Sequence, residues 1–351
     1  MATQPEAAMS LQSRAALSPR AKLAGGLALC LAIAVLAQLA GNAVPLVGAP
    51  LFAIAIGVVI TNTLRGPLHI NSLRVGDVSK ICLKGGIILL GASLDLGDIV
   101  RTGLESLPLL AITIGAGLVC SLWFGRMLGI DWRMRCLIGM GTTICGASAI
   151  AALAPVIRAR AEEIAYSVTV VFFFNMLAVF TFPALGHLMG LTDNGFGVWA
   201  GTAINDTSAV VAAGFSYSHD AGTTATVVKL TRTTLIIPLV IAFGLALPLF
   251  EPRQDQGDVS LARRVYQAMP LFILFFILAA ACKSLGLIGP LAEPIQLAGR
   301  WVLVVALAAV GLQGHWRAFV GAGSMPLLLG LLTWIAVAGS SLLVQSWTNT
   351  L

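Results

Sequence analysis

Long apolar runs separated by short polar stretches fill almost the whole chain after residue 20. Each run holds roughly 20 residues, the length that an α-helix needs to cross the hydrocarbon core of a bilayer. The pattern predicts an all-α integral membrane protein with eleven apolar segments. These lie near residues 21–41, 49–64, 78–97, 104–128, 134–157, 162–188, 196–217, 222–250, 264–284, 294–313 and 325–346.

The polar stretches between the segments are too short to form a soluble domain. Residues 1–20 are polar, so we expect a cytoplasmic N-terminal tail, followed by a single transmembrane domain over residues 21–351. Composition agrees with this division, because 58% of the residues are hydrophobic and only 10% are charged. Soluble domains carry about 25% charged residues.

Lysine and arginine gather in alternate connections. They lie before the first segment, between the second and third, between the fourth and fifth, and between the eighth and ninth: Arg14, Arg20, Lys22, Arg65, Arg74, Lys80, Arg126, Arg133, Arg135, Arg253, Arg263 and Arg264. The positive-inside rule places these connections in the cytoplasm, which predicts a multi-pass protein of the bacterial cell inner membrane with a cytoplasmic N-terminus. The net charge of +6 is explained by these loops, so no nucleic-acid partner is expected. Arg158 and Arg160 obey the rule only if the fifth segment enters and returns on the cytoplasmic side.

The fifth and seventh segments share a motif rich in small residues. Residues 141–152 (GTTICGASAIAA) and 201–212 (GTAINDTSAVVA) agree at six of twelve positions. Glycine and small hydroxyl residues suit backbone that unwinds beside a protein-lined cavity. Close helix packing uses the same residues and is the alternative, but it does not explain Asn205 and Asp206 at membrane depth. We therefore predict about nine transmembrane helices plus two re-entrant or broken segments.

A weaker similarity relates the third segment to the tenth at a constant offset. The matching pairs are Leu83 and Leu303, Gly91 and Gly311, Gly103 and Gly323, Leu107 and Leu327, and Leu109 and Leu329. If the two motif segments re-enter from opposite faces, the helices in each pair run antiparallel. Both similarities then predict inverted repeats, which recur in transporters.

Three charged residues lie inside the predicted membrane region. Asp206 is mid-way along the seventh segment, where a carboxylate is expected to have a function. Lys229 and Arg232 share one helix face at the start of the eighth segment. Two cations beside two helix breaks are suited to an oxyanion, with the positive ends of the broken helices adding to the site. The alternative is that Asp206 forms a structural ion pair with Lys229 or Arg232.

The candidate site follows from these motifs. The predicted substrate-binding residues are Thr142, Thr143, Ser148, Thr202, Asn205, Thr207, Ser208, Lys229 and Arg232, and the predicted ion-coupling residue is Asp206. Six cysteines lie singly, without ligand spacing, so we expect no metal site. No cofactor is expected, and no phosphate-binding Gly-x-x-x-x-Gly-Lys-Ser/Thr loop occurs.

From about residue 57 onward the chain resembles a bacterial family of conserved hypothetical membrane proteins described as sulfate exporters. The resemblance rests on residues 86–94 (GIILLGASL), 145–150 (CGASAI), 201–212 and 228–232 (VKLTR). It implies a secondary transporter related to the cation/proton antiporter and anion transporter group, with inverted repeats. Asn205 departs from the family, in which a histidine commonly precedes the aspartate, so Asp206 is the better candidate for coupling.

These observations favour a secondary active transporter, an exporter of a small oxyanion such as sulfate or an organic sulfonate, coupled to protons or sodium. The transmembrane domain is then a transporter domain. An anion channel is the first alternative. An intramembrane enzyme is less favoured, because Asp206 lacks a second carboxylate and no histidine lies in either motif. The expected partners are a small inorganic or organic anion, H+ or Na+, and membrane lipid, with a homodimer left open.

Overall fold

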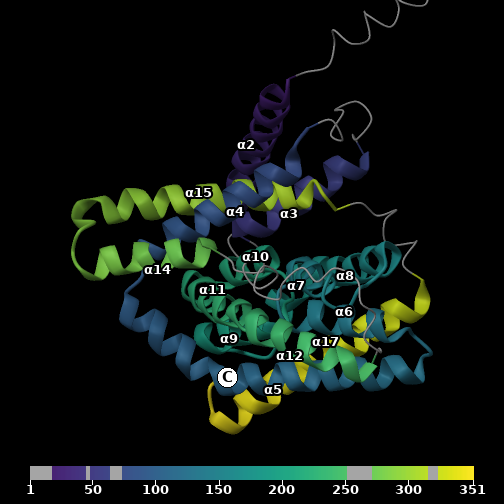
Figure 1. Cartoon of the computed structure of the whole chain (residues 1–351). Helices are drawn as coiled ribbons and strands as arrows, with labels where there is room; N and C mark the ends of the chain where they lie inside the picture. Colours follow the sequence, from purple (N-terminus) through teal and green to yellow (C-terminus); the bar gives the residue numbers. More distant parts are fainter. Residues whose placement is uncertain (1–17, 45–47, 64–72, 251–270, 315–322) are drawn as a thin grey trace, which may run out of the picture.

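The computed structural model describes residues 18–44, 48–63, 73–250, 271–314 and 323–351. Within these ranges all regular structure is helical, which confirms the all-α prediction (Figure 1). The α-helices are α2 (Pro19–Ala43), α3 (Gly48–Thr63), α4 (Val75–Gly91), α5 (Leu96–Met127), α6 (Trp132–Thr143), α7 (Ala147–Leu153), α8 (Ala161–Leu188), α9 (Asp193–Ala203), α10 (Thr207–Tyr217), α11 (His219–Thr234), α12 (Ile236–Phe250), α14 (Leu271–Ser284), α15 (Ala292–Gly311) and α17 (Ser324–Thr348). A short 3-10 helix, η2 (Gly289–Leu291), precedes α15.

Each of the eleven predicted apolar segments contains at least one of these helices. Three predicted segments are split, into α6 and α7, α9 and α10, and α11 and α12. Most of the predicted tail, the start of the segment at residues 264–284, and the basic residues Arg14, Arg65, Arg253, Arg263 and Arg264 lie outside the described residues.

Six helical stretches are long and apolar enough to cross a membrane. They are Pro19–Ala43, Leu96–Met127, Ala161–Leu188, His219–Leu245, Gly289–Gly311 and Ser324–Thr348. Helices α3 and α14 are apolar but shorter. The chain is therefore built as a multi-pass membrane protein, and the finer count of nine crossings stays a prediction.

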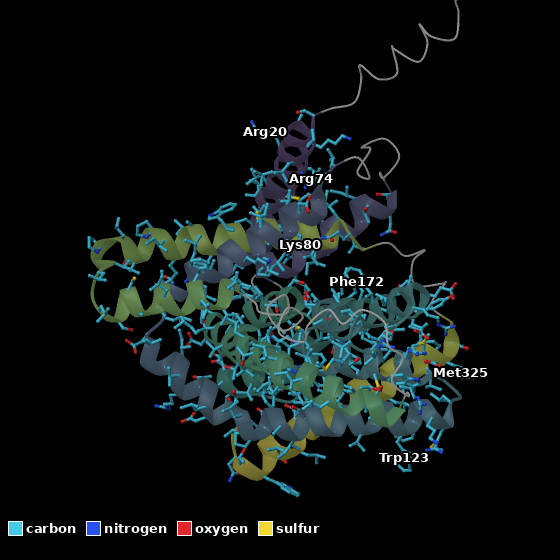
Figure 2. The ribbon with its side chains drawn as sticks, in the orientation of Figure 1. Arg20, Arg74, Lys80, Trp123, Phe172 and Met325 are labelled. Carbon is cyan, nitrogen blue, oxygen red and sulfur yellow. The ribbon has the colours of Figure 1, made fainter. Side chains whose placement is uncertain are left out.

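Helix α5 shows how these helices divide their surface between lipid and protein. Asp95 begins the helix by accepting a hydrogen bond from the backbone N–H of Gly97 (2.7 Å), which lowers the pKa of this carboxyl. Leu104, Val119 and Trp123 are more than 60% exposed on the outer face. Figure 2 shows Trp123 at the edge of the molecule. Large apolar side chains exposed in this way are suited to contact lipid.

Helix pairs from the two ends of the chain pack antiparallel. Between α4 and α15, Gly86 lies against Leu303 and Gly299 lies against Leu89. Residue numbers rise along one helix as they fall along the other, which is the antiparallel relation expected from the sequence. In α5 and α17, Gly117 likewise contacts Val337.

Helices α6 and α7 form a hairpin. The chain reverses at residues 144–146, where Gly146 has φ +68° and ψ −134°, a conformation open mainly to glycine. Arg133, near the start of α6, donates a hydrogen bond from Nε to the carbonyl of Ile157, beyond the end of α7 (3.1 Å). The two ends of the segment therefore lie together, and it does not continue as one straight helix.

Helices α9 and α10 form a second hairpin. Tyr217, at the end of α10, donates from its hydroxyl to the carbonyl of Leu191, just before α9 (2.5 Å), and its ring stacks on Phe196 with 3.9 Å between centroids. The chain reverses at residues 204–206. Helix α8 has 28 residues and separates the two hairpins. The open end of the α6–α7 hairpin lies at the start of α8, and the open end of the α9–α10 hairpin lies at its end.

Candidate functional site

The tips of the two hairpins meet inside the protein. We call residues 144–146 tip one and residues 204–206 tip two. A β-carbon placed on Gly146 would lie 3.5 Å from Cβ of Asp206, so the two tips are in contact. Helices α6 and α9 both end at this contact, whereas α7 and α10 begin there. Two negative and two positive helix ends are thus brought together.

Lys229 bridges the two tips from α11. Its ammonium donates to the carbonyl of Ile144 (2.6 Å) and to the carbonyl of Ile204 (2.9 Å), and the side chain is fully buried. These carbonyls follow the last turns of α6 and α9 and have no partner within their own helices. The cation therefore stabilises the negative ends of both helices.

Arg232 makes the same connection one turn further along α11. Its guanidinium donates to the carbonyl of Thr142 (2.9 Å) and also to that of Thr143, the last two residues of α6. It donates as well to the carbonyls of Thr202 and Ile204. The side chain is fully buried.

The partners of these two cations differ from those expected from the sequence. Coordination of an anion was expected, and the structure instead places both cations on backbone carbonyls. In this conformation Asp206 makes no direct ion pair with Lys229 or Arg232, because neither cation lies within ion-pair distance of a carboxylate in the described ranges. The reason is that sequence spacing shows two cations on one face but not which end of a broken helix they meet.

Asp206 acts as the N-cap of α10. Its carboxylate accepts from the backbone N–H of Ser208 (3.1 Å) and from the Ser208 hydroxyl, and the side chain is half-buried. A carboxylate at a helix N-terminus is stabilised by the helix dipole. The backbone N–H of Asp206 donates to Oδ1 of Asn175 (2.9 Å), which comes from the middle of α8. Asn175 was missed by the sequence analysis, although a lone amide within the apolar run 162–188 was the available signal.

Asn205 has no hydrogen-bond partner although it is only 1% exposed. Both its Oδ1 and its Nδ2 are buried and unpaired. Buried polar side chains nearly always have partners, so an amide of this kind is unusual and is a candidate for a functional role. Asn205 is next to Asp206 in tip two. It therefore marks the tips as a place where a bound group would complete the hydrogen bonding.

The remaining predicted residues divide into two sets. The hydroxyls of Thr143 and Thr202 donate to carbonyls of their own helices, at Gly139 and Val198 (both 2.8 Å), so they do not point to a ligand. Ser148 is exposed on α7, whereas Thr207 and Ser208 lie buried in the first turn of α10. All ten predicted residues thus lie in α11 and the two hairpins. Three of them, Thr142, Thr143 and Thr202, contact Arg232 through their backbone carbonyls and not through their side chains.

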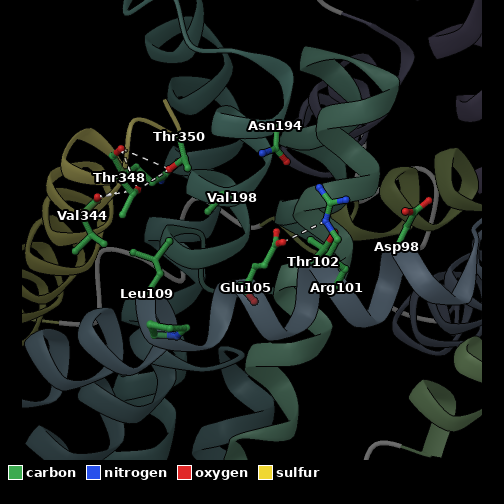
Figure 3. Close-up of a pocket in the computed structure, with 13 residues that line it drawn as sticks. Asp98, Arg101, Thr102, Glu105, Leu109, Asn194, Val198, Val344, Thr348 and Thr350 are labelled. Carbon is green, nitrogen blue, oxygen red and sulfur yellow. Dashed lines mark hydrogen bonds and ion pairs between the residues drawn. The ribbon is translucent and has the colours of Figure 1, made fainter.

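A pocket of about 450 Å³ lies away from the tips, where the α9–α10 hairpin begins (Figure 3). Asp98, Arg101 and Glu105 line it from α5. Asn194 and Val198 come from α9, and Thr348 and Thr350 lie on the opposite side near the end of α17. Val198 is one helical turn before Thr202, so the pocket approaches tip two from the outer end of α9.

The helices, the apolar exterior and the paired hairpins define a multi-pass membrane protein. Comparison with known proteins agrees with this class. The model of the family called conserved hypothetical protein 698 matches residues 25–330, and the chain belongs to this family.

Several curated relatives are similar over nearly their full length. A UPF0324 membrane protein of Streptococcus agalactiae serotype V is 37% identical over 334 residues, which covers 93% of this chain and 97% of the relative. Relatives with the same family name in Streptococcus pneumoniae (strain R6) and Streptococcus pyogenes serotype M18 are 37% and 36% identical, covering 93% and 91% of this chain and 97% and 96% of their own lengths. No solved structure matches. The names of these relatives state a membrane protein and no substrate.

Proposed function

We propose that this protein is a secondary active transporter, an exporter of a small oxyanion such as sulfate or an organic sulfonate, coupled to protons or sodium. The observation that carries the proposal is the meeting of the two tips around Asn205, whose buried amide has no partner. Next to it in the chain lies the half-buried carboxylate of Asp206. A donor amide supports anion binding, and a carboxylate near it supports coupling to a cation.

The arrangement of the hairpins supports alternating access. They begin at opposite ends of α8, so in a membrane each would enter from a different face and end near the middle. Lys229 and Arg232 donate to carbonyls of both hairpins, so the tips meet at one point inside the protein. This geometry is typical of transporters with broken helices at the binding site.

Paired glycine contacts support inverted repeats. Gly91 and Gly311 match in the sequence similarity, and each packs closely on the backbone of a short apolar helix: Gly91 on Phe276 of α14, and Gly311 on Ile54 of α3. Gly117 contacts Val337, which lies 220 positions later in the chain. The same offset of 220 relates Leu83 to Leu303 in the sequence similarity. Such contacts are expected where a two-fold axis passes between the repeats.

Labelling from either side of the membrane tests the re-entrant topology. Cysteines introduced at Arg158 and Thr192 are expected to react from the cytoplasm and the periplasm respectively, because α8 alone separates them. A cysteine at Arg126 is the cytoplasmic control. The background is a variant in which Cys82 and Cys282, the two half-buried native cysteines, are replaced by alanine. Periplasmic labelling at position 158 would rule out re-entry of the α6–α7 hairpin.

A thermal-shift screen of the purified protein tests anion binding. Sulfate, sulfite, thiosulfate, taurine and carboxylates would be compared as choline or Tris salts, and we expect a saturable rise of Tm with a sulfur oxyanion. An Asn205→Leu variant should fold as well as the wild type, because it removes an unpaired amide, but should bind the anion about tenfold more weakly.

Asn175→Leu is the matched control in this screen. It breaks a formed hydrogen bond to Asp206 and should lower stability by about 1–3 kcal/mol. If Asn205→Leu is the less stable of the two and binds the anion normally, the amide is structural and the proposed site is wrong.

A further inference from the structure

A chain of buried side-chain hydrogen bonds connects the pocket of Figure 3 to tip two. Gln345 of α17 lines the pocket, and its Nε2 donates to Oγ of Ser341 (3.1 Å). Oγ of Ser341 lies 2.6 Å from Oγ1 of Thr202, whose backbone carbonyl accepts from Arg232. All four side chains are at most 1% exposed. The side-chain hydrogen bonds end at the Thr202 hydroxyl, and the backbone carbonyl of the same residue accepts from Arg232, the cation that holds the tips.

One assignment of donors satisfies every hydroxyl of this chain. The Thr202 hydroxyl has one hydrogen, which it donates to the helix carbonyls of Val198 (2.8 Å) and Trp199 (3.0 Å). Ser341 therefore donates to Thr202 and accepts from Gln345. The amide N–H of Gln345 is used inside the chain, which leaves its Oε1 as a buried acceptor without a partner on a residue that lines the pocket. A bound group with positive charge or a donor hydrogen would satisfy it.

The charges of the pocket favour a cation. Arg101 is neutralised by Glu105, with 3.1 Å between Nε and Oε1. Asp98 adds a second carboxylate, so the charged groups in the lining leave one net negative charge. The hydroxyls of Thr102 and Thr348 add neutral oxygen atoms. Small hard cations prefer such oxygen donors.

We propose that this pocket, with Gln345 in its lining, is a binding site for an alkali cation. The inference rests on the proposed function, in which such an ion drives export, and it selects sodium as the coupling ion. Gln345 offers a neutral amide oxygen, which can ligate a metal cation but does not take up a proton, whereas the carboxylates of Asp98 and Glu105 belong to α5. The pocket lies at the start of α5, at the opposite end of that helix from Arg126, which is the periplasmic end in the topology that the positive-inside rule predicts.

The test is a NaCl titration of the purified full chain at constant ionic strength, with choline chloride as the replaced salt and Tm as the readout. The wild type is expected to show a saturable Na+-specific rise of Tm. Gln345→Leu should raise the half-saturating Na+ concentration about tenfold, and Gln345→Glu should lower it, because a carboxylate attracts the ion more strongly.

Two further variants separate binding from folding. Ser341→Ala should weaken the Na+ effect, whereas Ser340→Ala should not, because the Ser340 hydroxyl bonds the carbonyl of Val337 outside the chain (3.1 Å). If Gln345→Leu does not fold, Glu105→Gln changes only an exposed side chain and should still weaken Na+ binding about threefold.

A Tm that ignores Na+, or one with the same half-saturating concentration in the wild type and Gln345→Leu, would overturn the inference. A response to pH alone would do the same and assign the coupling to protons. The anion screen in sodium-free salts is an independent readout. Loss of the Na+ effect with the anion shift intact therefore contradicts this inference and leaves the proposed function standing.

Discussion

An Arg232→Leu variant is expected to lose much of the stability of the protein. The guanidinium donates to carbonyls of Thr142, Thr143 and Thr202, which lose this donor in the variant, and to that of Ile204, which keeps Lys229 as a partner. Each unsatisfied group costs about 1–3 kcal/mol, and the costs are not additive. A loss on the order of 3–5 kcal/mol is a large part of a typical total of 5–15 kcal/mol. Thermal unfolding in detergent measures it.

Two variants serve as controls for Arg232→Leu. Arg101→Leu removes an exposed arginine that pairs with Glu105, and should change stability by at most about 1 kcal/mol. Arg232→Lys should be intermediate, because one ammonium cannot match the planar fork of a guanidinium. If Arg232→Leu unfolds like the wild type and loses only anion binding, the cation faces the substrate, as the sequence alone predicted, and the carbonyl contacts are secondary.

An Asp206→Asn variant is expected to fold and bind anion but to lose ion-driven transport. Asparagine caps a helix as well as aspartate does, so α10 keeps its N-cap and Tm should stay near that of the wild type. The negative charge is lost, so a cation can no longer be attracted or released there. Gradient-driven flux in proteoliposomes is expected to fall at least about tenfold, a loss of the size produced by removing one charge-assisted contact.

Asp206→Ala is the comparison that isolates the cap. It removes both the charge and the cap, and the missing cap should cost about 1 kcal/mol of stability. If Asp206→Asn transports with the same dependence on pH and Na+ as the wild type, coupling occurs at another residue. If it fails to fold while Asp206→Ala folds, the capping explanation is wrong.

Much of the helical layout could be predicted because membrane helices are recognised in a sequence as apolar runs of about 20 residues. The two motif segments could also be predicted to break, since Gly141, Gly146 and Gly201 make a lipid-facing helix unfavourable. The apolar run 222–250 was predicted as one segment. The structure has one helical stretch there, His219–Leu245, interrupted only at Leu235 between α11 and α12.

The chemistry of the tips was harder to predict because it depends on backbone groups. A sequence shows that Lys229 and Arg232 share a face, but a broken helix offers carbonyls at one end and N–H groups at the other. Only the hairpin geometry decides which end the cations meet. Asn175 and Gln345 were missed for a related reason: each is a single amide in an apolar run, and its importance comes from the partner it has or lacks.

Coupled flux in proteoliposomes is the most direct measurement of transport through the tips. Vesicles containing the wild type and loaded with radiolabelled sulfate, or with the anion found in the binding screen, would be given a Na+ or proton gradient. We predict that the anion moves against its own gradient while the ion gradient lasts, stops when an ionophore collapses it, and does not do so with Asp206→Asn. Flux that runs only down the anion's own gradient, at a rate unchanged by the ion gradient, would contradict secondary transport and identify a channel.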